Sequence, residues 1–151
     1  MKKTIIAAGV LAALSLTGCA TSQQQAELQR SYENLEGTLR QAQEAATVTC
    51  DGEAACDRAW KLTQVYVQQE SGMKVRLATD TTIDTYAPTE YGMATFSATR
   101  LPVGNQTAIR LFGQCKGMYG TDGKPGPNYS QCATAVGVSQ ARFSTFVRER
   151  M

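Results

Sequence analysis

The sequence contains no histidine. Histidine is the side chain whose charge changes near neutral pH, and it carries much of general acid-base catalysis. Catalytic triads, histidine-ligated metal centres and histidine proton shuttles are therefore excluded. A carboxylate pair remains conceivable for a glycan-cleaving enzyme, since Asp80, Asp84 and Glu90 lie at or beside predicted strand ends. Acidic residues at strand ends are far more often solvated turn residues, so we expect a protein that is not an enzyme.

The chain also carries little excess charge, with 15 Lys and Arg residues against 13 Asp and Glu residues. Lys2 and Lys3 lie in an N-terminal segment that we predict to be removed, and without them the basic count falls to the acidic count. A near-neutral mature protein lacks the basic footprint of a nucleic-acid-binding protein. We therefore expect no nucleic-acid partner.

The hydrophobic run near the N-terminus is too short for a permanent transmembrane anchor. Its residues 5–14 would form a helix of roughly 15 Å, half of a hydrocarbon core of about 30 Å. Lys2 and Lys3 precede the run, and small or polar residues lead from it to Cys19. This order is typical of a secretory signal, so residues 1–18 are predicted to be a signal peptide.

Residues 16–19, Leu-Thr-Gly-Cys, resemble the lipobox of bacterial lipoproteins. The resemblance covers residues 1–20 only. It implies cleavage before Cys19, a covalent diacylglycerol on the Cys19 thiol and a fatty acyl chain such as palmitate on its amine, with no other cofactor. Several acyl chains, at about 0.8 kcal/mol per buried methylene, give stable membrane attachment. Because Ala20 rather than Asp follows the cysteine, the resemblance also implies the outer membrane, on the periplasmic side.

Four further cysteines are present, Cys50, Cys56, Cys115 and Cys132. An even number of cysteines in an oxidising compartment indicates disulfides. Of the three possible connectivities, sequence proximity favours Cys50 with Cys56 and Cys115 with Cys132. A four-thiolate zinc site is the alternative, but the spacing includes no C-x-x-C pair and the chain offers no histidine ligand, so no metal is expected.

Residues 19–26 comprise the lipidated cysteine and a small, polar segment, which we predict to be a tether. A long helix is predicted over residues 27–47, because hydrophobic residues then recur every three or four positions. They are Leu28, Tyr32, Leu35, Leu39, Ala42 and Ala46. This heptad pattern could pair with a partner helix, but the flanking positions lack the opposed charges that select one. The favoured interpretation is a helix packed on the protein's own core.

Residues 27–151 are predicted to form a single α+β domain, with residues 48–151 as its core. A second helix is expected over residues 53–69, with Trp60 as a core anchor. Alternating patterns predict strands over residues 73–79, 83–86, 94–99 and 107–115, and short connections between them favour antiparallel pairing. A helix from residue 129 onward is expected, with a fifth strand over residues 132–138 as the alternative. The predicted fold is an antiparallel sheet of four or five strands, with N-terminal helices and a C-terminal helix packed on one face.

The segment between Cys115 and Cys132 is rich in glycine and proline and is predicted to be a loop. A disulfide-closed loop loses little conformational entropy on binding, so it is a candidate recognition surface. Its candidate contact residues are Met118, Tyr119, Lys124 and Tyr129. The alternative is that glycine and proline only allow the chain to turn. Four basic residues, Lys74, Arg76, Arg100 and Arg110, are a second candidate surface if they share one outward face of the sheet.

These features together predict a non-enzymatic lipoprotein of the outer membrane that binds or supports another envelope component. That partner would be an envelope protein or peptidoglycan. An inhibitor of a wall-degrading hydrolase such as lysozyme, acting through the disulfide-closed loop, is the alternative. A carboxylate-based glycan enzyme ranks third.

Overall fold

The computed structural model describes residues 17–151, and their side chains from residue 22 onward. Residues 1–16 of the predicted signal peptide, and the Cys19 side chain that is predicted to carry the lipid, lie outside what is described. The chain divides into two compact units, residues 1–34 and residues 35–151. The described part of the first unit is entirely helical. The sheet, the disulfides and the other helices belong to the second unit.

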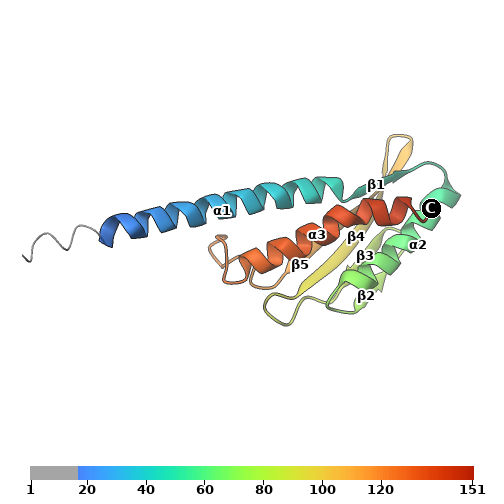
Figure 1. Ribbon diagram of the computed structural model, residues 1–151. Helices are drawn as coiled ribbons and strands as arrows, with labels where there is room; N and C mark the ends of the chain where they lie inside the picture. The colour runs from blue at the N-terminus through green and yellow to red at the C-terminus, as the bar shows by residue number, and fades with distance from the viewer. Residues whose placement is uncertain (1–16) are drawn as a thin grey trace, which may run out of the picture. The chain divides into compact units, whose positions relative to one another are not determined.

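The second unit is an α+β fold, as the sequence predicted. Its sheet has five antiparallel strands in the order β1-β5-β4-β3-β2. Helices α2 and α3 lie side by side on one face of this sheet (Figure 1). The elements are α1 (Thr17–Ala45), β1 (Thr47–Cys50), α2 (Glu53–Glu70), β2 (Val75–Ala78), β3 (Thr82–Thr85), β4 (Ala94–Val103), β5 (Gln106–Cys115) and α3 (Tyr129–Arg148).

The fifth strand is β1, which the sequence analysis did not predict. The alternative of a strand over residues 132–138 is wrong, because these residues lie in α3. The buried positions of α3 recur at helical spacing and include Cys132, Val136, Phe143 and Val147. Strand β1 has four residues, and only Val48 and Cys50 point into the core, which is too short a pattern to identify a strand.

Helix α1 also differs from the prediction. It begins at Thr17 rather than at residue 27 and ends at Ala45 rather than at 47, so the segment predicted as a polar tether is helical instead. The reason is composition, because residues 20–36 contain no glycine or proline and are rich in alanine, glutamine and glutamate, which are good helix formers.

The core of the second unit lies between the sheet and helices α2 and α3. Phe96, Ala98, Ile109 and Leu111 point into it from the two long central strands, and Phe143 reaches it from α3; all five are at most 1% exposed. Tyr66 of α2 lies against Phe143, with the ring centroids 5.4 Å apart. Burial, with a further effect of the Glu70 carboxylate, raises the pKa of the Tyr66 phenol, so this group stays a donor to the Ser139 carbonyl oxygen at 2.5 Å.

Two disulfides fix the joints between strands and helices, with the connectivity that sequence proximity favoured. Cys50, at the end of β1, is bonded to Cys56 in the first turn of α2. Cys115, at the end of β5, is bonded to Cys132 in the first turn of α3. Each bridge therefore ties a strand end to the start of a covering helix.

Trp60 acts as a core anchor, as predicted, and offers a test of how α2 is held. Its side chain is only 7% exposed, and its Nε1 donates to the Thr79 carbonyl oxygen at 2.8 Å. We expect Trp60→Phe to lower the free energy of unfolding by about 1 to 2 kcal/mol, because one hydrogen bond and part of the buried area are lost. Urea denaturation measures this loss.

Val65→Ala is the matched control on the same helix, since Val65 is 42% exposed. It should change stability by less than about 0.5 kcal/mol. Equal effects of the two substitutions would contradict the anchoring role of Trp60.

Candidate functional site

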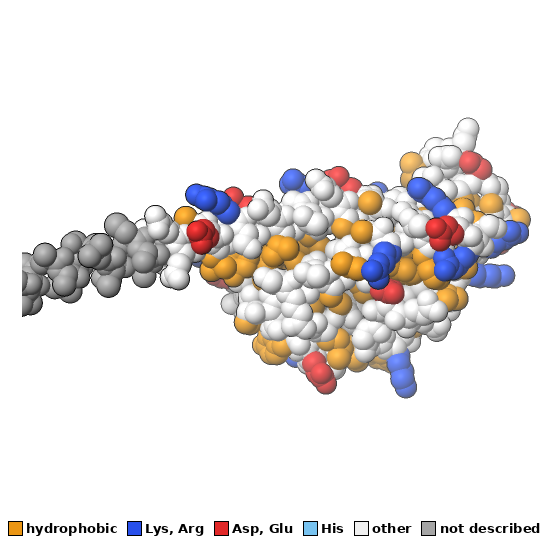
Figure 2. All heavy atoms as spheres, in the orientation of Figure 1, with side chains coloured by type: hydrophobic (Ala, Val, Ile, Leu, Met, Phe, Trp, Pro, Cys, Tyr) orange, Lys and Arg blue, Asp and Glu red, His pale blue; other side chains and the backbone are white. Residues whose placement is uncertain are grey.

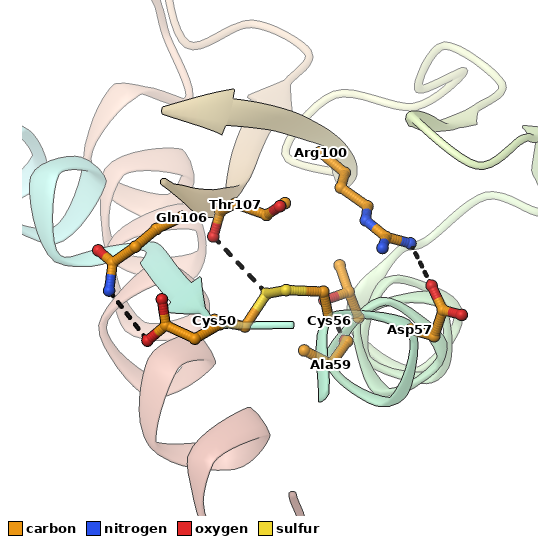
Figure 3. Close-up of a disulfide and its surroundings, with 9 residues drawn as sticks. Cys50, Cys56, Asp57, Ala59, Arg100, Gln106 and Thr107 are labelled. Carbon is orange, nitrogen blue, oxygen red and sulfur yellow. Dashed lines mark hydrogen bonds and ion pairs between the residues drawn. A yellow bond between two sulfur atoms is a disulfide. The ribbon is translucent and has the colours of Figure 1, made fainter. Parts of the chain in front are cut away.

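A polar cleft of about 390 Å³ lies where helix α2 begins, close to the Cys50–Cys56 disulfide. It combines the first turns of α2 with the β2–β3 turn and the end of the β4–β5 hairpin. Its lining residues are Glu53, Asp57, Asp80, Thr81, Arg100, Leu101, Pro102 and Thr107. Figure 3 shows the disulfide between the strand and the helix, with Arg100 reaching across to Asp57.

Arg100 is the one basic residue among those that line this cleft. Its Nη1 donates to Asp57 Oδ1 at 2.8 Å, and its side chain is 18% exposed, against 49% for Asp57. The prediction that Arg100 lies on the outward face of the sheet is wrong. Strand β4 continues to Val103, so its alternation keeps Arg100 on the same face as Phe96 and Ala98, beneath the helices.

The two aspartates predicted as a carboxylate pair do not share a site. Asp80 lines the cleft, whereas Asp84 lies on the opposite face of the sheet, between the buried residues Ile83 and Thr85, and forms an ion pair with Arg76. Instead, Asp80 shares the cleft with Glu53 and Asp57, four residues apart on α2, a grouping that the sequence analysis missed. Within the described residues, no group of three or more Cys, Asp or Glu side chains could hold a metal ion.

The candidate recognition loop is only partly available to a partner. Met118 is 6% exposed and Tyr129 1% exposed, so the prediction that these two side chains contact a ligand is wrong. The loop folds back on itself, with the Gly126 N–H donating to the Met118 carbonyl at 2.8 Å. Tyr129 is the first residue of α3 and points inward.

Tyr119 and Lys124 remain exposed on this loop. The Tyr119 hydroxyl donates to Glu36 Oε1 on α1 at 2.8 Å, while the Lys124 ammonium lies 3.8 Å from Asp122. Partial burial, together with the hydrogen bond to Glu36 and its negative charge, raises the pKa of Tyr119 to about 12. The phenol is therefore a neutral, oriented donor at physiological pH, and it fixes the position of the ring.

Comparison with protein-family models, curated proteins and solved structures finds no significant match. Among the residues that the structure describes, no helix combines the length and the apolar character that crossing a bilayer requires. The function is therefore inferred from this chain's own residues.

An apolar groove of about 450 Å³ is a second feature that the sequence analysis missed. It lies between the last turns of α1 and the middle of α3, where Figure 2 shows hydrophobic side chains gathered along the helix boundary. Small side chains leave the groove open and no charged residue lines it. Its lining residues are Leu35, Thr38, Gln41, Ala42, Ala45, Ala133, Thr134, Gly137, Val138 and Ala141.

Proposed function

We propose that this protein is a lipoprotein of the bacterial outer membrane, attached through acyl chains on Cys19 and facing the periplasm. Its folded unit, residues 35–151, binds or supports another component of the cell envelope and does not catalyse a reaction. The lipobox-like residues 16–19 motivate the attachment. The arrangement of the other cysteines supports the compartment.

The two disulfides are the observation that carries this proposal. All four cysteines that follow residue 19 are paired, and each pair ties a strand end to a helix start. Such structural disulfides persist in exported proteins and are rare in the reducing cytosol. A fold that depends on two such disulfides is suited to an oxidising compartment outside the cytoplasm, to which the predicted signal peptide would direct the protein.

The cleft and the carboxylates favour binding over catalysis. The carboxylate pair on which a glycan-cleaving site depended is divided between the two faces of the sheet, because Asp84 pairs with Arg76 and Asp80 lines the cleft. In the cleft, Arg100 already forms an ion pair with Asp57. Asp80 and Asp84 therefore cannot face one substrate bond as general acid and nucleophile.

Inhibition of a wall-degrading hydrolase is a second candidate, supported by the exposure of Tyr119 and Lys124 on the disulfide-closed loop. An inhibitor slows wall lysis by lysozyme in proportion to its amount, and the double substitution Tyr119→Ala with Lys124→Ala removes the effect. An unchanged lysis rate in the presence of excess protein would exclude this function for lysozyme.

Membrane fractionation tests the main proposal. In cells grown with labelled palmitate, the protein should carry the label and sediment with the outer-membrane fraction of a density gradient. Acyl chains account for both results, because they bind the hydrophobic core of the bilayer and carry the label. Labelled protein in the inner-membrane fraction would contradict the outer-membrane assignment, and unlabelled protein in the soluble fraction would contradict lipid attachment altogether.

A further inference from the structure

The face of the sheet opposite α2 and α3 has a polar surface, which we call the open face; only near the start of β4 is it covered, where Thr95 is 2% exposed. Strand alternation and register place its residues, since Phe96, Ala98, Ile109 and Leu111 point to the helices and their neighbours point away. One cross-strand row on this face runs through all the strands except β2. Its members, in spatial order, are Thr47, Arg110, Thr99 and Thr82.

Arg110 stands in this row without a carboxylate beside it. It is exposed, its two cross-strand neighbours are Thr47 and Thr99, and none of the ion pairs within the described residues includes it. The single acidic residue in the five strands is Asp84, and Arg76 already pairs with it. The strand residues of the open face therefore carry one net positive charge, in the form of a guanidinium that can bind a carboxylate through two parallel hydrogen bonds.

Arg110 has the hydroxyl groups of Thr47 and Thr99 across the strands, and Ala108 and the aromatic ring of Phe112 as its neighbours along β5. Phe112 lies two residues along β5, so it points to the same face, and its partner across the strands is Ser97. Phe112 is 36% exposed, which leaves part of its ring open to a ligand. Hydroxyl donors and acceptors beside an aromatic ring suit a sugar, which has hydroxyl groups at its edge and apolar C–H groups on its faces.

The apolar side chains of this face gather at one end of it and not at its centre. Leu101, Val103 and Ala108 lie together at the end of the β4–β5 hairpin, while polar residues such as Ser97 and Thr99 separate them from Leu77 on β2 and Phe112 on β5. Protein interfaces usually have a contiguous apolar centre with a polar rim. The open face lacks that centre, which favours a polar polymer over a folded protein as its ligand.

We propose that the open face binds the carboxylate-bearing glycan of the cell wall, with Arg110 on a carboxylate of the peptide stem. The row of threonines would lie along the sugar hydroxyls, and Phe112 would contact the apolar face of a ring. This inference deepens the proposed function, since it names the envelope component that is bound. It requires no catalytic step and no contribution from the cleft or the groove.

Co-sedimentation with purified cell-wall sacculi tests the proposal, with the full chain extracted from membranes and kept in detergent micelles. We expect the protein to bind sacculi and to bind less as salt rises, because the charge contact is screened. Arg110→Ala should weaken binding by at least about tenfold, Arg110→Lys should weaken it less, and Phe112→Ala should weaken it several-fold. Sacculi whose carboxylates have been amidated, and chitin, which has none, should bind no better than Arg110→Ala binds native sacculi.

Lys61→Ala is the matched control, because it removes one exposed positive charge from α2, on the helix-covered side. It should leave binding unchanged, and near-UV circular dichroism should show every variant to be folded. Wild-type affinity of a folded Arg110→Ala would overturn the inference, as would binding only to anionic lipid vesicles or to acidic proteins. The detergent-extracted protein is tested away from its membrane, so the two tests are independent. Absence of sacculus binding would not contradict lipid attachment, and absence of palmitate labelling would not contradict wall binding.

Discussion

Replacing Cys19 with serine should abolish palmitate labelling completely. A serine hydroxyl cannot form the thioether that joins the diacylglycerol, and signal cleavage of the lipobox type follows that modification. The Cys19→Ser precursor should therefore keep residues 1–18 and take up no lipid. Thr21→Ser, a conservative change outside residues 16–19, is the control and should retain both the label and the processed length.

A second variant separates lipid attachment from the retained signal segment, whose apolar run could itself hold the precursor at the membrane. Residues 1–19 are replaced by the signal peptide of an ordinary secreted protein, cleaved before Ala20. This form should be released by osmotic shock, because the acyl chains that bind the bilayer are absent. Continued sedimentation of this form with membranes, or palmitate on Cys19→Ser, would contradict attachment through Cys19.

Removing the Cys115–Cys132 bridge with Cys115→Ala and Cys132→Ala should lower the free energy of unfolding by about 3 kcal/mol. The bridge joins residues 17 apart, so it restricts a sizeable loop of the unfolded chain. Cys132 is fully buried at the first turn of α3, so the end of β5 and the start of that helix should also loosen. Urea denaturation measures the loss, and hydrogen exchange at the start of α3 locates it.

The Cys50–Cys56 bridge provides an internal comparison. Its cysteines are 6 residues apart, so the same chain-entropy relation gives a smaller loss, about 2 kcal/mol, for Cys50→Ala with Cys56→Ala. The informative result is that removing the Cys115–Cys132 bridge lowers the free energy of unfolding more than removing the Cys50–Cys56 bridge does. If neither double substitution lowered stability, the bridges would not be structural, and their support for an oxidising compartment would disappear.

The elements with regular, long patterns were predictable from the sequence. Helix α2 and strands β4 and β5 bury residues at spacings that a single chain reveals, and the Gly104-Asn105 turn joins those two strands as its residues indicate. Strand β1 was not predictable, because only two of its four residues, Val48 and Cys50, are buried and its partner strand β5 is far away in the sequence.

Site residues were harder to predict, because the position of an element's end decides which way a side chain points. Strand β4 runs four residues beyond its predicted end, which keeps Arg100 under the helices, and the start of α3 at Tyr129 turns that side chain inward. Arg110 was correctly expected on an outward face, since β5 alternates without interruption. The cleft and the groove each depend on residues far apart in the sequence, so only the folded chain could reveal them.

The mass of the N-terminal peptide of the protein purified from membranes is the most direct measurement of lipid attachment. We predict that this peptide begins at Cys19 and is heavier than its sequence by one diacylglycerol and one fatty acyl chain. A peptide that still contains residues 1–18, or one that begins at an unmodified Cys19, would contradict the proposed lipoprotein.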